Sequence, residues 1–180
     1  MTKVDKLLHA FEAALREPWA ATLSGQEKVW FLVYEPAEQR KVDLQIGEFE
    51  IRAKAARKTW IPISLKQVFP EWMARHEYRE EYFADPTALA DQLEYDFRDF
   101  VIQYLRDQIR AGSDGPHALI ALTGVGALFG FCRLSEVLKG ATESLQGRLL
   151  VFFPGEFSSN QYRLLDARDG WNYLARPITA

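Results

Sequence analysis

The sequence has few of the side chains from which catalytic and metal sites are usually built. Its 180 residues include one cysteine, Cys132, and three histidines. A single cysteine excludes a disulfide within the chain and a zinc site made of several thiolates. Three histidines leave little material for a site based on imidazole. We therefore expect no metal and no cofactor.

Long hydrophobic runs and an excess of positive charge are missing as well. Because no stretch reaches about 18 consecutive apolar residues, no transmembrane helix is expected. Charged side chains interrupt residues 1–17, so we expect no signal peptide. The 22 Lys and Arg are outnumbered by 25 Asp and Glu, and a net charge of -3 argues against a protein that coats DNA or a membrane. We expect a cytoplasmic protein with no membrane partner.

The chain is instead rich in apolar and aromatic residues. Hydrophobic residues make up 48% of it, and the aromatic ones are 12 Phe, 7 Tyr and 5 Trp. This is enough to build a hydrophobic core, and the length suits a single domain. We expect one α/β domain over residues 1–180, with an N-terminal helix over 1–17 and a helical insertion over 66–111.

Short apolar runs predict the strands. The runs are residues 29–34, 59–64, 118–124 and 148–153, and two further short strands are expected at 161–167 and 171–178. The first run, VWFLVY, is typical of a strand buried on both faces. Pro62 predicts a position near a sheet edge for the second strand, because proline cannot donate a ladder hydrogen bond. Pro154-Gly155 is expected to end the fourth strand.

Helical spacing predicts the segments between the strands. Thr2 and Asp5 resemble a capping box at the start of the N-terminal helix. Residues 37–57 fit both a strand and a helix, and we choose the helix because good helix formers dominate there. Inside the insertion, we expect short helices over 66–83 and then a long helix that Asp85-Pro86 opens. A last helix is expected over 127–141.

This alternation of strands and helices predicts a three-layer αβα sandwich. The sheet is expected to have four to six strands, to be mainly parallel and to have right-handed crossovers. The two C-terminal strands, joined by a turn at Arg168-Asp169-Gly170, are expected to add antiparallel pairing at an edge.

Ligands of open α/β sheets bind beyond the carboxyl ends of the strands, which here are residues 34–36, 123–126 and 154–157. The middle end is the sharpest candidate, because glycines lead from a strand into a helix whose N-terminus favours anions. The candidate anion loop comprises Thr123, Gly124, Gly126 and Gly130, with Arg133 as a possible cation. The glycine spacing matches neither the dinucleotide fingerprint nor the Walker A loop. This mismatch favours the alternative that the glycines only permit a tight turn and close packing.

A second candidate lies in an acidic segment. Residues 71–99 contain nine Asp and Glu and three Arg, so their formal charge is -6 and the rest of the chain carries +3. Helical spacing predicts a row of aromatic and charged side chains there, comprising Trp72, His76, Tyr78, Arg79, Tyr82 and Phe83. Because Tyr, Trp and Arg dominate interface hot spots, the row predicts a protein-docking surface. The alternatives are simple packing onto the sheet and, less favoured, acid–base chemistry by Glu77, Glu80 or Glu81.

Other residues offer weaker hypotheses. Four arginines near the C-terminus keep nucleic-acid binding open, although they fall on separate elements: Arg148, Arg163, Arg168 and Arg176. Cys132 has apolar neighbours, which predicts an inert thiol. No HExxH or GxSxG spacing occurs, and we expect that the protein is not an enzyme.

Several stretches, in their order along the chain, resemble the BrxB family of the bacterial BREX phage-defence system. They are GQEKVWFLVYEP (25–36), GEFEI (47–51), EWMARHEYREEYF (71–83), LTGVGALFGFCRLSEVL (122–138), GRLLVFFPGEF (147–157) and YRLLDARDGWNYLARPI (162–178). The resemblance covers nearly the whole chain, and its specificity rests on the ordered set.

The resemblance implies an accessory protein encoded beside an ATPase, a DNA methyltransferase and PglZ, a protein of the alkaline-phosphatase superfamily. It transfers no catalytic residues. It implies a non-enzymatic adaptor that binds other BREX proteins, the PglZ-like protein above all, and meets DNA only through the assembly. The alternative is a nucleotide- or phosphate-binding domain that uses the degenerate loop at 123–130, and the third hypothesis is a nucleic-acid-binding accessory protein.

Overall fold

A mainly parallel sheet forms the centre of the computed structural model, which describes residues 1–112, 115–165 and 173–180. Parallel strands lie in the order β2-β3-β4-β1-β6, and β5 pairs antiparallel with β4. The strands are β1 (Val29–Tyr34), β2 (Thr59–Ser64), β3 (Ala118–Thr123), β4 (Arg148–Ser158), β5 (Gln161–Leu164) and β6 (Arg176–Ile178). As Pro62 predicts, β2 is an edge strand.

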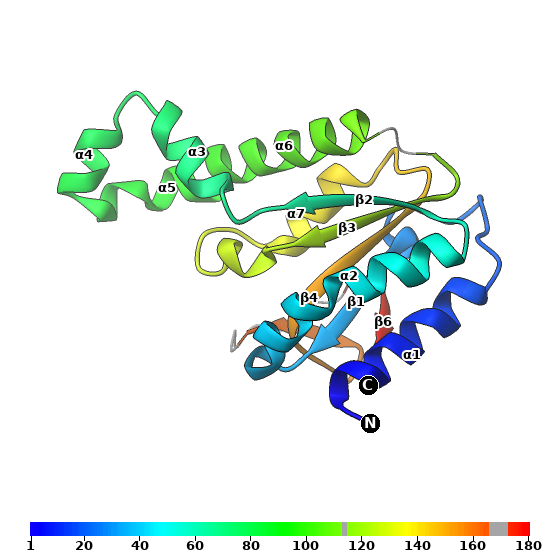
Figure 1. Cartoon of the computed structure of the whole chain (residues 1–180). Coiled ribbons are helices and arrows are strands. Elements are labelled where there is room, and N and C mark those ends of the chain that lie inside the picture. Colours follow the sequence, from blue (N-terminus) through cyan, green and yellow to red (C-terminus); the bar gives the residue numbers. More distant parts are fainter. Residues whose placement is uncertain (113–114, 166–172) are drawn as a thin grey trace.

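Helices cover both faces of this sheet (Figure 1). One face packs against α1 (Lys3–Arg16) and α2 (Gln39–Ala55), and the other packs against α6 (Arg98–Ala111) and α7 (Leu134–Ala141). Alternate residues of β1 supply the two cores: Phe31 lies in the core under α6 and α7, whereas Leu32 lies in the core under α1 and α2. The predicted three-layer αβα sandwich is therefore confirmed.

The insertion between β2 and β3 is built of short helices before α6. They are α3 (Val68–Arg75), α4 (Arg79–Ala84), the 3-10 turn η3 (Pro86–Leu89), α5 (Ala90–Gln92) and the π-helical turn η4 (Leu93–Phe97). The predicted long helix is thus regular only from residue 98 onward. The helical region does begin at Asp85-Pro86, as predicted. The Asp85 carboxylate caps its first turn, η3, by accepting a hydrogen bond from the Thr87 amide. Figure 1 shows α4 and α5 projecting beyond the arrowheads of β2 and β3.

Helix boundaries elsewhere follow local chemistry. Thr2 and Asp5 form the predicted capping box, with N···O distances of 2.7 and 3.1 Å. The ambiguous segment 37–57 is helical, as predicted, and follows the 3-10 turn η2 (Pro36–Glu38). A further 3-10 turn, η1 (Gln26–Lys28), precedes β1.

The predicted helix over 127–141 is wrong at its start. A 3-10 turn, η5 (Val125–Leu128), follows β3, and α7 begins only at Leu134. Gly130 explains the delay, because its φ of 79° is left-handed and cannot continue a right-handed helix.

The C-terminal part corrects two predictions. β4 does not end at Pro154-Gly155 but continues to Ser158, because its extension pairs with β5. Antiparallel pairing holds for β5, whereas β6 adds to β1 in parallel. The predicted turn at Arg168-Asp169-Gly170 lies outside the described residues.

Gly155 provides a test of the β4–β5 pairing. A Cβ atom at this position would lie 1.9 Å from the Arg163 carbonyl oxygen, so the two strands would have to separate. We expect Gly155→Ala to lower the free energy of unfolding by about 2 kcal/mol or more, measured by urea denaturation.

Gly47 is the matched control. It lies within α2, and a Cβ atom there would meet nothing within 4 Å. Gly47→Ala should therefore raise the free energy of unfolding by about 0.5–1 kcal/mol, because alanine favours a helix. Equal stability of Gly155→Ala and the unaltered protein would contradict the pairing.

Candidate functional site

The predicted row of aromatic side chains is divided between the interior and the surface of the insertion. No single helix carries it, because α3 ends at Arg75 and α4 begins at Arg79. Trp72 and Tyr82 are buried, at 4% and 8% exposure. The His76 ring lies between them, with centroid distances of 5.0 and 4.9 Å.

A hydrogen bond joins this interior group to η4. The Trp72 indole nitrogen donates to the Asp96 carboxylate at 3.0 Å, and His76 lies 3.7 Å from the same carboxylate. Trp72 also packs on Phe97, at 5.2 Å between centroids. Trp72, His76 and Tyr82 therefore hold the short helices of the insertion together.

The other two aromatic residues of the predicted row, Tyr78 and Phe83, face solvent. Tyr78 and Phe83 are 50% and 62% exposed, and Arg79 is exposed beside them in sequence. Tyr95, which lies outside the predicted row, is 58% exposed. Exposed apolar side chains that gather on one segment are typical of an interaction site, whereas single ones are common on any surface.

Unpaired acidic side chains accompany these aromatic residues. Arg79 lies 3.7 Å from Glu80, and Arg98 lies 3.0 Å from Asp99. Exposed carboxylates of this segment without an ion-pair partner in the described part of the chain include Glu77, Glu81, Asp91 and Glu94. We call these four, together with Tyr78, Arg79, Phe83 and Tyr95, the insertion surface.

A cavity of about 310 Å³ lies at the carboxyl ends of β1 and β3, beside Phe152 and Pro154 of β4. The chain leaves β1 toward α2 on one face of the sheet and leaves β3 toward α7 on the other. The two connections diverge around the point where the parallel pairing of β4 with β1 ends, and open α/β sheets bind ligands at such positions. We call this cavity the carboxyl-end pocket.

The predicted anion loop contributes only part of this pocket. Thr123, Gly124 and Gly126 line it, whereas Gly130 and Arg133 line a separate cavity. The cation of the carboxyl-end pocket is Lys66, which follows β2. The pocket therefore lies at the strand end that the glycines indicated, but the cation that lines it is Lys66 and not Arg133.

Gly124 explains how Lys66 comes to this position. Its φ is 75°, and a Cβ atom there would lie 2.8 Å from Lys66 Cγ and 2.9 Å from the Lys66 amide nitrogen. Only glycine permits this close approach of the two loops. The packing interpretation thus holds for Gly124.

A short hydrogen-bond chain forms another wall of the carboxyl-end pocket. The Tyr34 hydroxyl donates to Gln39 Oε1 at 2.9 Å, and Gln39 Nε2 donates to Asp43 Oδ1 at 2.7 Å. Burial raises the pKa of Tyr34 above its ordinary value, so the hydroxyl remains protonated. Tyr34 belongs to one of the strand ends that the sequence marks and Lys66 follows another strand, β2, but no sequence signal selects Gln39 or Asp43.

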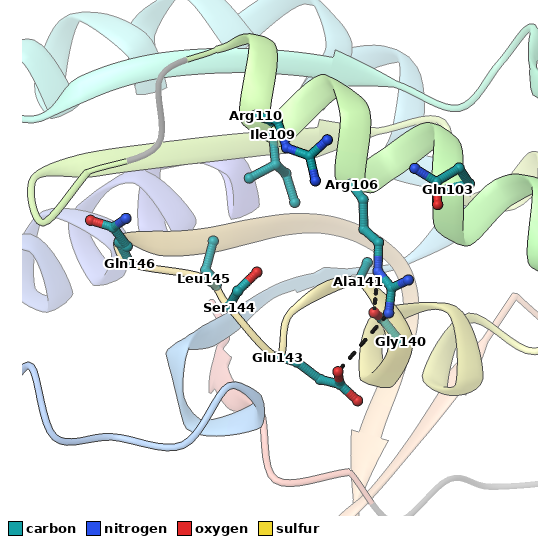
Figure 2. Close-up of a pocket in the computed structure, with 10 residues that line it drawn as sticks. All are labelled: Gln103, Arg106, Ile109, Arg110, Gly140, Ala141, Glu143, Ser144, Leu145 and Gln146. Atoms are coloured by element: carbon teal, nitrogen blue, oxygen red, sulfur yellow. Dashed lines mark hydrogen bonds and ion pairs between the residues drawn. The ribbon is translucent and has the colours of Figure 1, made fainter.

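A larger cavity, of about 530 Å³, lies between α6 and the segment that joins α7 to β4 (Figure 2). Figure 2 shows Arg106 directed at Gly140 and Glu143, and its Nε donates to the Gly140 carbonyl at 2.8 Å. The Arg106 guanidinium lies 4.0 Å from Glu143, and Arg110 lies 3.8 Å from Asp107. Its cations already have carboxylate partners, so it suits an anionic ligand less well than the carboxyl-end pocket does.

The C-terminal arginines are engaged within the fold. Arg148 is 3% exposed and donates to the carbonyl oxygens of Gly147 and Ala20. Arg163 pairs with Glu156 at 2.8 Å. Arg176 pairs with Glu17 through two hydrogen bonds. Arg168 lies outside the described residues.

The remaining candidates give no cluster of reactive groups. Within residues 1–112, 115–165 and 173–180, no three His, Cys, Asp or Glu side chains converge as metal ligands would. No helix in that part of the chain is long and apolar enough to cross a bilayer. The predicted acid–base residues Glu77, Glu80 and Glu81 are exposed.

Cys132 should be a slow nucleophile. Burial raises the pKa of its thiol from 9.0 to about 12, so at pH 8 the thiolate fraction is about a thousandfold below that of an ordinary thiol. We expect iodoacetamide at pH 8 to label the folded protein at least a hundredfold more slowly than the urea-unfolded chain. Because the unfolded thiol ionises first, Cys132 lowers folding stability only as the pH rises from about 9 toward 12. Rapid labelling of the native protein would contradict the inert assignment.

Comparison with known proteins identifies the family. No curated protein and no solved structure matches the chain. A family model does match, over residues 62–177, and its description is BREX protein BrxB. The match takes in the whole insertion surface and the loop at 123–130, and it covers well over half of the chain. The chain therefore belongs to the BrxB family and is a component of the BREX phage-defence system.

Proposed function

We propose that the protein is a non-enzymatic adaptor of the BREX assembly and that its insertion surface binds the PglZ-like protein. The observation that carries the proposal is the exposure of Tyr78 and Phe83 on a segment that projects beyond the sheet. The choice of partner follows from the family resemblance.

Burial of the exposed rings would supply binding free energy. Phe and Tyr side chains bury about 150–250 Å² when fully covered, and apolar burial contributes about 25 cal/mol per Å². Phe83, at 62% exposure, retains more than half of that area for a partner. Arg79, which follows Tyr78 in the sequence, is a residue type that interface hot spots favour.

The unpaired carboxylates would select a partner with a basic surface. Residues 71–99 carry a formal charge of -6, and Glu77 and Glu81 flank the exposed aromatic residues in sequence. Complementary charge increases the rate of association and rejects acidic partners. We therefore expect the contacted face of the PglZ-like protein to combine Lys or Arg with an apolar depression.

The buried side of the insertion would keep the binding surface ordered. The Trp72–Asp96 hydrogen bond and the rings of His76 and Tyr82 fix α3 and α4 relative to η4. A rigid surface loses less conformational entropy when it binds than a mobile one does. Alanine variants of Trp72 or Tyr82 would consequently report on folding, and the binding test must use exposed residues.

The double variant Tyr78→Ala/Phe83→Ala tests the surface. We expect its affinity for the purified PglZ-like protein to fall about tenfold or more, measured by titration calorimetry, because two exposed anchors are lost. The matched control is Leu44→Ala/Ile51→Ala, which removes two side chains of α2 that are 78% and 60% exposed. The control should bind as the unaltered protein does. Normal binding by a folded Tyr78→Ala/Phe83→Ala protein would show that the insertion surface is not the interface.

Charge removal gives a separate prediction about the rate. Glu77→Gln/Glu81→Gln should slow association with the PglZ-like protein at low salt and weaken its salt dependence, with a smaller effect on dissociation. Stopped-flow measurements at about 50 and 200 mM salt would show both changes. Unchanged rates at both salt concentrations would remove the electrostatic part of the proposal.

A further inference from the structure

We propose that the carboxyl-end pocket binds a small organic monophosphate of nucleoside size, with its phosphate at Lys66 and a hydrogen-bond donor of its body at Asp43. This site is distinct from the insertion surface and from the adaptor function. Three features of the pocket support the inference. They are its position in the sheet, a cation without an ion-pair partner, and the absence of a side chain at Gly126.

The place in the sheet is determined by the topology. The pocket lies where the chain departs from β1 and from β3 toward opposite faces, and residues from both departures line it. Its volume of about 310 Å³ is at the lower end of the usual range for small-molecule sites, about 300–1,000 Å³. The space therefore suits a ligand of nucleoside monophosphate size.

Lys66 supplies the charge for an anion. No carboxylate lies within 4.0 Å of its ammonium group in the part of the chain that the structure describes. By contrast, Arg106 and Arg110 of the larger cavity both have acidic neighbours. An ammonium group acts as a point charge toward phosphate, as the lysine of a phosphate-binding loop does.

Gly126 leaves space on the same wall as Lys66. Its φ is not left-handed, and a Cβ atom there would meet only Leu165, at 4.0 Å. Neither backbone conformation nor packing therefore requires glycine at this position, unlike Gly124. The absent side chain enlarges the pocket and lets a ligand approach the backbone closely.

The opposite wall defines the other end of the ligand. Asp43 already accepts one hydrogen bond from Gln39, and a carboxylate has capacity for more. Much of the remaining lining is apolar, with Val125, Ala127, Phe152 and Pro154. A nucleoside monophosphate provides all three parts: a phosphate, a flat apolar face and donor groups on the base.

Thermal shift and titration calorimetry at low salt, on the full chain, test the site. The probes are AMP, GMP, CMP and UMP, with inorganic phosphate and adenosine as partial ligands. We expect at least one monophosphate to raise the melting temperature and to bind at least tenfold more tightly than either partial ligand. No stabilisation by any of the four monophosphates would overturn the proposal, and so would equal binding by inorganic phosphate.

Two variants then locate the ligand. Lys66→Gln should weaken binding of the best monophosphate at least tenfold, whereas Lys139→Gln, which removes an exposed charge from α7, should change it less than twofold. Gly126→Val should also weaken binding at least tenfold because it fills the pocket, and its melting temperature without ligand checks that the fold is retained. Undiminished binding by a folded Lys66→Gln protein would overturn the proposal. The affinity of Lys66→Gln for the PglZ-like protein should be unchanged, which separates this site from the adaptor surface.

Discussion

The pairing of β1 with β4 is the constraint on which the rest of the molecule depends. All six residues of β1 are buried, and its register with β4 runs from Val29 opposite Leu149 to Tyr34 opposite Pro154. Phe31 stands at the centre, with its ring 4.8 Å from Phe153 and 4.5 Å from Tyr162. Because both faces of this pair are apolar, helices must cover both, and the three-layer architecture follows.

The same pair also decides where the carboxyl-end pocket lies. β4 enters the sheet between β3 and β1, although β1 and β3 send the chain to opposite faces. The space beside Pro154 of β4 is therefore bordered by the segments that follow three other strands, β1, β2 and β3. Beyond this point β4 continues and holds β5, and the Tyr162 hydroxyl donates to the Ala175 carbonyl, which fixes the C-terminal segment to the core.

The insertion shows how one group of aromatic residues serves two purposes. Trp72 and Tyr82 are buried around His76 and stabilise the short helices, while Tyr78 and Phe83 remain exposed. A break between α3 and α4 makes this division, because a continuous helix would place Trp72, His76 and Phe83 on one side. The structure thus combines an ordered support with an exposed acidic and aromatic surface on a projecting segment.

The sequence by itself determined the strands β1 and β2, the capping box at Thr2, the α/β class and the family, because apolar runs, local hydrogen bonds and ordered motifs are properties of neighbouring residues. Its errors were also local: the left-handed Gly130 delays α7, and β4 passes Pro154 because β5 pairs with it. Only the tertiary structure decided that Lys66 joins Tyr34 and Asp43 at one pocket while Arg133 does not, and that Trp72 is buried while Phe83 is exposed. The physical reason is that these contacts join residues far apart in the chain. The order of the strands and the breaks between the helices bring such residues together, and no local pattern encodes either.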